Sequence, residues 1–142
     1  MAFKKVSGKT KIVYLPVTPS TAIAEGSIVS FSSGYLIAAT SSTTALSHAG
    51  VLRKTIAATD ADYAVARTVP VEVPVEKNVV WEAPVTSGLV AADVGLLVDL
   101  TNAYTIDRSA TVIDAAQVVK VLSTTLGHFI LNIGGGTGEI NS

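Results

Sequence analysis

The stretch that decides the fold is AEGSIVSFSSGYLIAATSSTTALSHAGVL, residues 24–52. A β-branched and aromatic run, Ile28 to Phe31, meets a Ser-Ser-Gly turn, and a second run, Tyr35 to Ala38, follows it. Two such runs around a glycine-containing turn predict a β-hairpin. A Ser/Thr-rich loop then leads to Gly50, and nothing in the stretch has the pattern of a catalytic motif. It predicts a structural or binding module built of strands.

The run VPVEVPVE, residues 69–76, carries the clearest strand period. Valine alternates with proline or glutamate, which gives one apolar and one polar face. The two prolines, Pro70 and Pro74, exclude a helix and leave one side of the strand without a full set of N–H donors. The run therefore predicts an edge strand or an extended arm.

Further strand candidates follow along the chain. Leu96 to Leu100 and Tyr104 to Asp107 form one predicted hairpin, Val118 to Ser123 and His128 to Ile133 form another, and Ile12 to Leu15 and Val79 to Glu82 are shorter strands. Helix is scarce: Asp60 to Ala66 and Asp114 to Gln117 are the candidates for one or two short turns. Many short strands at close spacing predict a small all-β, single-domain barrel or sandwich.

Composition supports one domain with little charge. The chain has 142 residues, and its charged fraction of 15% is below the usual level of roughly 25%. Mean hydropathy is high, at +0.51, but no apolar run reaches the roughly 18 residues that span a bilayer. Surplus apolar surface without a membrane segment predicts burial between subunits, so we expect a homo-oligomer and no membrane partner.

Charge is unevenly distributed, although the net charge is only −1. Four lysines, Lys4, Lys5, Lys9 and Lys11, precede the first acidic residue, Glu25. We expect residues 1–15 to form an extended basic arm, residues 16–133 a β-domain, and residues 134–142 a flexible Gly-rich tail. The near-neutral total argues against nucleic-acid binding. No cysteine is present, and no apolar segment of a secretory signal follows the first lysines, so we expect synthesis in a cytoplasm.

The motifs that carry chemistry are incomplete. Ser7-Gly8-Lys9-Thr10 ends like a phosphate-binding loop, but Phe3 stands where the first glycine would be required. Glu72 and Glu76 would be roughly 13 Å apart on one strand, too far for a glycosidase pair. His48 and His128 are the only histidines, and the sequence has no G-x-S-x-G elbow. We therefore expect no enzyme activity, catalytic residue, cofactor or metal site.

Trp81 is the only tryptophan and lies within VVWEAP, residues 79–84, which includes the strand candidate Val79 to Glu82. A single aromatic without polar aromatic neighbours predicts a core or interface anchor rather than a sugar-stacking platform. With Val71 and Val73, it is our candidate for a subunit interface.

The order of these segments resembles the capsid decoration, or cement, proteins of tailed bacteriophages. The resemblance covers most of residues 20–133 and rests on a series of segments rather than on one diagnostic motif, so no family site transfers residue by residue. The segments are EGSIVSF at 25–31, SGYLIAAT at 33–40, AGVL at 49–52, VPVEV at 69–73, VVWEAPV at 79–85, ADVGLLVDL at 92–100 and VVKVLSTT at 118–125.

The resemblance implies a structural virion protein, made in the host cytoplasm, that coats the capsid surface and stabilises the shell by bridging subunits. Its partners would be the major capsid protein and further copies of itself, three as a first expectation. The basic arm would supply the capsid contact through Lys4, Lys5, Lys9 and Lys11, with Ile12 and Tyr14.

Two other classes stay open. A head-completion or tail-tube protein would share the β-rich self-association, and copy number would separate it from a decoration protein. A β-sandwich module that binds glycans or a receptor would use the Ser/Thr loops, with a ligand site near Trp81. An enzyme with a site assembled from scattered acids has little support in the sequence.

Overall fold

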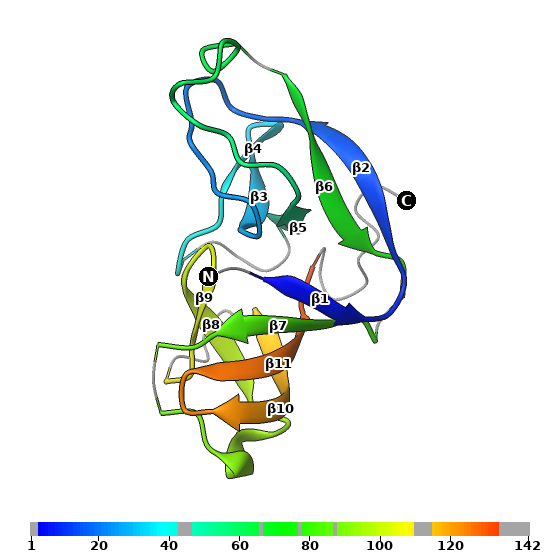
Figure 1. Ribbon diagram of the computed structural model, residues 1–142, viewed down its shortest axis with the longest axis vertical. Helices are drawn as coiled ribbons and strands as arrows, with labels where there is room; N and C mark the ends of the chain where they lie inside the picture. The colour runs from blue at the N-terminus through cyan, green and yellow to red at the C-terminus, as the bar shows by residue number, and fades with distance from the viewer. Residues whose placement is uncertain are drawn as a thin grey trace.

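The computed structural model describes residues 3–42, 47–65, 67–76, 78–86, 88–109 and 115–133. This part of the chain is all-β, with two antiparallel sheets and a single 3-10 turn, η2 (Ala91–Asp93) (Figure 1). The predicted fold class is confirmed. Neither sheet closes into a barrel, so the arrangement corresponds to the sandwich alternative.

The six-stranded sheet has the order β1-β7-β11-β10-β8-β9. Its strands are β1 (Lys4–Ser7), β7 (Val80–Pro84), β8 (Leu97–Asn102), β9 (Thr105–Asp107), β10 (Ala116–Ser123) and β11 (Leu126–Leu131). The five-stranded sheet has the order β2-β6-β5-β3-β4. Its strands are β2 (Thr10–Pro16), β3 (Ile28–Ser32), β4 (Tyr35–Ala38), β5 (His48–Leu52) and β6 (Thr68–Pro74).

All three predicted hairpins are present. β3 and β4 pair across Ser33 and Gly34, both of which have positive φ, at 52° and 86°. Positive φ at both central residues matches the right-handed twist of a two-residue hairpin, and glycine adopts it without a steric penalty. β8 pairs with β9, and β10 pairs with β11. In β11, Phe129 and Leu131 are buried and His128 faces the other way, as the alternation predicts.

The N-terminal segment is not a separate arm. β1 pairs with β7 and β2 pairs with β6, so residues 4–16 contribute a strand to each sheet. Phe3 is buried in the core, and its N–H donates to the carbonyl of Gly26 at 2.9 Å. The proposed boundary between residues 15 and 16 falls inside β2. The segment is extended, but the pairing of its backbone with β6 and β7 makes it part of the domain.

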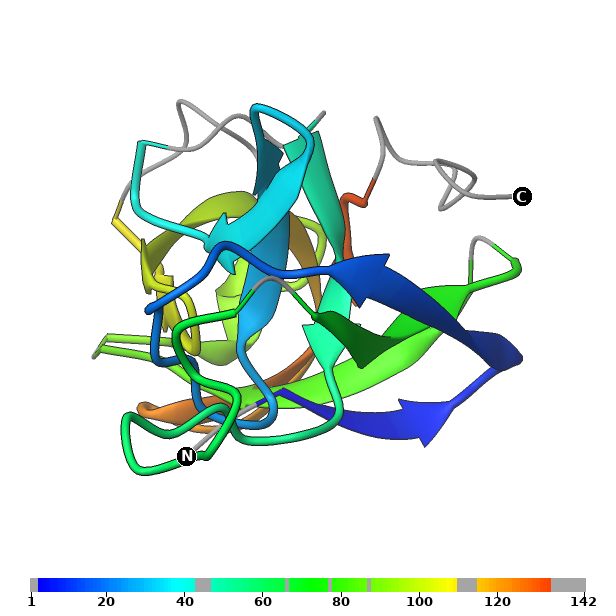
Figure 2. The same cartoon turned by 90° about the horizontal axis from the view of Figure 1, so that it is seen from above.

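Two sharp corners carry the chain between the sheets, one at Gly8 between β1 and β2 and one between β6 and β7. Figure 2 shows the two strand pairs meeting at this bend. The N–H of Val75 donates to the carbonyl of Lys9 at 3.0 Å, which continues the β2–β6 ladder into the bend. The four strands thus form one bent two-stranded ribbon, β1–β2 paired with β6–β7, that belongs to both sheets.

The proline-rich strand β6 is not an edge strand, as the sequence had suggested, because it lies between β2 and β5. Its odd-numbered residues bond to β2, which leaves the proline nitrogens on the side of β5. On that side the ladder is short, with only Val51 and Leu52 of β5 in register with β6. The prediction that one side cannot form a full ladder is therefore confirmed. The conclusion drawn from it is wrong, since an interior strand can tolerate prolines where its neighbour is short.

The buried apolar residues form two cores. The larger core lies on the inner face of the six-stranded sheet, around Trp81 and Phe129, and takes Ile28 and Val51 from the five-stranded sheet. The smaller core lies on the opposite face of the five-stranded sheet and is covered by the loops that carry Ile23 and Ile56. The five-stranded sheet is therefore buried on both faces along β3 and β5.

Neither predicted helix forms in the described residues. Residues 60–65 make consecutive turns, because the Asp60 carboxylate accepts the N–H of Ala57 at 3.0 Å and the guanidinium of Arg67 at 2.9 Å. Ala116 and Gln117 begin β10 instead of a helical turn. Asp114 and the Gly-rich tail, residues 134–142, lie outside the described residues.

The corner at Gly8 predicts a large cost for any side chain there. Gly8 has φ of +100°, and a Cβ on it would lie 2.7 Å from the Cα of Val79. Gly8→Ala should therefore cost more than the roughly 1–2 kcal/mol of left-handed strain alone. The control is Gly34→Ala, since Gly34 has φ of +86° and no atom within 4 Å of the added Cβ. Urea unfolding of both variants measures the difference, and equal losses would contradict the close approach.

Candidate interaction surface

The residues predicted for a capsid contact are adjacent in sequence, but they do not share one face. Lys4 lies on the outer face of the six-stranded sheet, opposite Glu82. Lys5 has the other orientation, as the partner of the buried Trp81. Ile12 and Tyr14 lie on one face of β2, and Lys11 lies on the other. Strand alternation separates what the sequence places side by side.

Lys5 takes part in a polar cluster that links the two sheets. Its Nζ lies 3.7 Å from Oε2 of Glu72 on β6, and the hydroxyl of Thr10 donates to the same oxygen. Arg53, just after β5, places Nε 3.6 Å from Oε1 of Glu72 and Nη2 3.6 Å from Glu25. The Glu72 side chain is only 10% exposed, so these cations compensate its partial desolvation. Lys5 is therefore engaged inside the domain, a role that the alternation of β6 alone could not reveal.

Ile12 and Tyr14 form the most exposed apolar feature on a regular strand. They are 49% and 65% exposed, whereas Leu15, on the other face of β2, is buried. Ile12 lies opposite Glu72, and Tyr14 lies opposite Pro70. Residues directly opposite each other in an antiparallel pair share a face, so exposed Ile12 and Tyr14 and half-buried Pro70 form one apolar surface beside the Glu72 cluster.

A row of polar side chains crosses the outer face of the six-stranded sheet. Lys4 is in register with Glu82, Glu82 with His128, and His128 with Lys120, on strands β1, β7, β11 and β10. Nε2 of His128 lies 3.3 Å from Oε1 of Glu82. The row has a lysine at each end, Lys4 on β1 and Lys120 on β10, and the Glu82 carboxylate between them.

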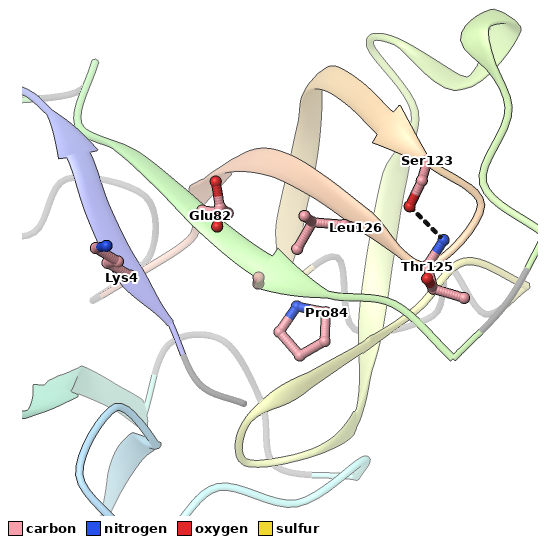
Figure 3. A pocket seen from close by; sticks show the side chains of 7 residues that line it. Lys4, Glu82, Pro84, Ser123, Thr125 and Leu126 are labelled. Atoms are coloured by element: carbon pink, nitrogen blue, oxygen red, sulfur yellow. Dashed lines mark hydrogen bonds between the residues drawn. The ribbon is translucent and has the colours of Figure 1, made fainter.

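A depression of about 420 Å³ lies at the end of this row (Figure 3). Lys4 and Glu82 line it with Pro84, Leu126 and the β10–β11 turn, where the hydroxyl of Ser123 accepts the N–H of Thr125 at 3.3 Å. Its lining combines one ammonium, one carboxylate, the hydroxyls of Ser123 and Thr125, and apolar side chains.

The residues predicted for a subunit interface are buried within the chain. Val71 and Val73 belong to the smaller core, and Trp81 belongs to the larger one. None of the three side chains reaches the surface, so the predicted interface is wrong. A sugar-stacking role for Trp81 is excluded for the same reason. Val71 and Val73 looked available because β6 resembled an edge, whereas β2 and β5 pair with it on both sides.

His48 is an unusual buried group. It is fully buried on β5 in register with Ser30. Among the described residues, neither the Ser30 hydroxyl nor the ring nitrogens have a partner in full hydrogen-bond geometry, although the backbone of Asn132 lies close enough to favour the protonated ring. Burial lowers the pKa of His48, and the backbone of Asn132 opposes part of this effect. His48 is therefore neutral in the folded protein at pH 7, and its protonation would place a charge between the sheets.

Two arginine–aspartate pairs fasten the loops around the sheets. Arg108 donates from Nε and Nη2 to the two carboxylate oxygens of Asp93, both at 2.9 Å. This fork and the N–H of Val90 lower the pKa of Asp93 and hold η2 against the end of β9. The N–H of Ala57 and the guanidinium of Arg67 lower the pKa of Asp60 in the same way. These carboxylates are used structurally.

Polar side chains converge in the described residues around Glu72 and at the Glu82–His128 contact. No three histidine or acidic side chains in the described part of the chain lie close enough to hold a metal ion. No helix in that part of the chain has the length and apolar character needed to cross a membrane. The chain matches no protein-family model and no curated protein.

His48 predicts a pH-dependent stability. Because its folded-state pKa lies below the ordinary value near 6.5, the unfolded chain binds the proton first as the pH falls. The free energy of unfolding should therefore decline below about pH 6.5, by at most about 1.4 kcal/mol per pH unit, until the folded-state pKa is passed. His48→Leu should remove this decline, and Ser30→Ala, its nontitrating neighbour, should retain it. Urea unfolding at pH 7.5, 6.5 and 5.5 measures it, and an unchanged decline in His48→Leu would refute the assignment.

Proposed function

We propose that the chain is a structural virion protein that binds the outer surface of a tailed-phage capsid and stabilises the shell by bridging capsid subunits. The observation that carries the proposal is the surface of β2. β2 exposes Ile12 and Tyr14 on one face and carries Lys11 on the other, with Lys9 just before the strand, and no acidic residue occurs between Lys4 and Pro16. Such a surface suits an acidic partner that also offers apolar contacts.

The bent ribbon supports this role mechanically. β2 is held by β6 along its whole length, and the ribbon continues through Gly8 into the other sheet. A load applied at β2 is therefore distributed over backbone hydrogen bonds in both sheets. A protein that bridges shell subunits needs such a rigid attachment rather than a mobile arm.

Self-association belongs to the same proposal, through surfaces other than the buried Val71, Val73 and Trp81. The β8–β10 end of the six-stranded sheet exposes Leu97, Val119 and Leu122. Apolar side chains at this end would suit contact with further copies of the chain, with three copies as the first expectation.

Purified particles from the source provide the direct test. Quantitative mass spectrometry should find the chain at a copy number comparable to that of the major shell protein. A few copies per particle would favour a head-completion or tail-tube role. Absence from the particle would contradict the virion assignment and leave a glycan- or receptor-binding module as the alternative.

Charge reversal on β2 should weaken shell binding. The double variant Lys9→Glu/Lys11→Glu places like charge against an acidic shell, and we expect at least a tenfold loss of affinity for undecorated shells in a sedimentation assay at low salt. Deletion of residues 2–11 would not test this surface alone, because it would remove β1 and the start of β2.

The matched control is Lys120→Glu, which reverses one exposed charge on the outer face of the six-stranded sheet. It should bind shells as the wild type does, and all variants should keep the wild-type unfolding midpoint. Full binding by the β2 double variant would remove this surface from the proposal.

A further inference from the structure

The outer edge of β2 has free backbone groups. The N–H of Val17 donates to the carbonyl of Arg67 at 2.8 Å, and the N–H of Val75 donates to the carbonyl of Lys9 at 3.0 Å. Both bonds use odd-numbered residues of β2 and its extensions. Because bonded and non-bonded pairs alternate along an antiparallel ladder, the N–H and C=O groups of Ile12 and Tyr14 point away from β6.

This free edge has defined ends. At one end the chain bends at Gly8. At the other, Pro16 has no N–H, and the N–H of Thr18 already donates to the carbonyl of Leu36 at 3.0 Å. Between these ends, Ile12 and Tyr14 have no backbone hydrogen-bond partner among the residues that the structure describes. In Figure 1, β2 lies at the border of the molecule with β6 on its inner side.

The side chains around the edge alternate in character. Ile12 and Tyr14 project from one face of β2, and Lys11 projects from the other, with Lys9 beside it in the turn. Among the described residues, no acidic side chain forms an ion pair with Lys9 or Lys11. A strand added to this edge would therefore meet Ile12 and Tyr14 on one face, and on the other face Lys11 followed by the half-buried Val13, with Lys9 just before the strand.

We propose that the β2 edge accepts an extended segment of another protein in which acidic and apolar residues alternate, and binds it as an additional strand. The backbone of the segment would bond to Ile12 and Tyr14, its apolar side chains would lie against these two residues, and its carboxylates would approach Lys9 and Lys11. The inference rests on the proposed function for the identity of the partner, the major capsid protein, but not for the geometry of the edge.

Charge decides between this partner and a second copy of the chain. Pairing two β2 edges would bring two sets of Lys9 and Lys11 together, and like charges close together on paired strands are unfavourable. The Glu76 carboxylate lies at the end of this segment, where it accepts the N–H of Lys9 at 3.3 Å, but it forms no ion pair with either lysine in the described part of the chain. Lysine on an edge strand discourages self-pairing, while it attracts an acidic segment. The edge therefore favours a heterologous partner.

The test uses the full chain and two capped heptapeptides, one of alternating aspartate and valine and one with lysine in place of aspartate. In heteronuclear NMR at low salt, the acidic peptide should shift the amide resonances of Ile12 and Tyr14 and slow their hydrogen exchange. The lysine peptide should leave both unchanged. Acidic-peptide shifts centred on Lys120 or elsewhere, without protection of Ile12 and Tyr14, would overturn the proposal.

Two variants separate backbone pairing from side-chain contact. Tyr14→Pro removes an N–H that points to the free edge and should weaken acidic-peptide binding at least tenfold. Tyr14→Val keeps the N–H and should weaken it less. Equal affinity of the two variants would overturn strand addition. If Tyr14→Pro does not fold, N-methylation of the peptide residues that would bond to β2 makes the same test on the wild-type chain, and undiminished binding would overturn the proposal.

The peptide and shell experiments together distinguish failure of the edge proposal from failure of the proposed function. Binding of the acidic peptide at β2 without binding to shells would contradict the proposed function and leave the edge site intact. Shell binding that Tyr14→Pro does not weaken would overturn the edge proposal and leave the proposed function intact.

Discussion

The bent ribbon formed by β1–β2 and β6–β7 is the constraint on which the rest of the structure depends. Because the same two segments supply neighbouring strands in both sheets, the sheets cannot be positioned independently. The close approach of Gly8 to Val79 sets the bend, and the cluster around Glu72 fills the polar space beside it. The orientation of β2, and therefore of its free edge, follows from this bend.

Local sequence patterns predicted the parts of the fold that local chemistry determines. The three hairpins follow from apolar runs separated by turn residues, with Ser33-Gly34 as the best example. The path of residues 4–16 could not be predicted in this way. Its partners, β6 and β7, lie more than fifty residues further along the chain, and no local pattern specifies which strand will pair with a lysine-rich segment.

The prolines of β6 illustrate the same limit. Pro70 and Pro74 correctly indicated a side without a continuous ladder, but the sequence does not say whether that side faces solvent or a short neighbouring strand. In the structure this side faces a short neighbouring strand, β5. Val51 and Leu52 are in register with β6, and Arg53 donates its N–H to the carbonyl of Pro70 at 3.0 Å. The two strands can approach closely at this point because residue 50 is glycine: a Cβ on Gly50 would lie 2.5 Å from the carbonyl oxygen of Glu72.

The high mean hydropathy also has an internal explanation. A sheet buried on both faces needs two apolar cores, and Val71 and Trp81 are used in different ones. Many of the apolar side chains whose number suggested subunit contacts are therefore buried within one chain. Among the apolar side chains exposed on regular strands, Tyr14 and Ile12 have the largest exposed fractions, and both lie on β2, an edge strand whose outer side carries unpaired backbone groups. Because apolar contact and hydrogen bonding are both available there, β2 can bind an extended segment more strongly than a surface that offers either alone.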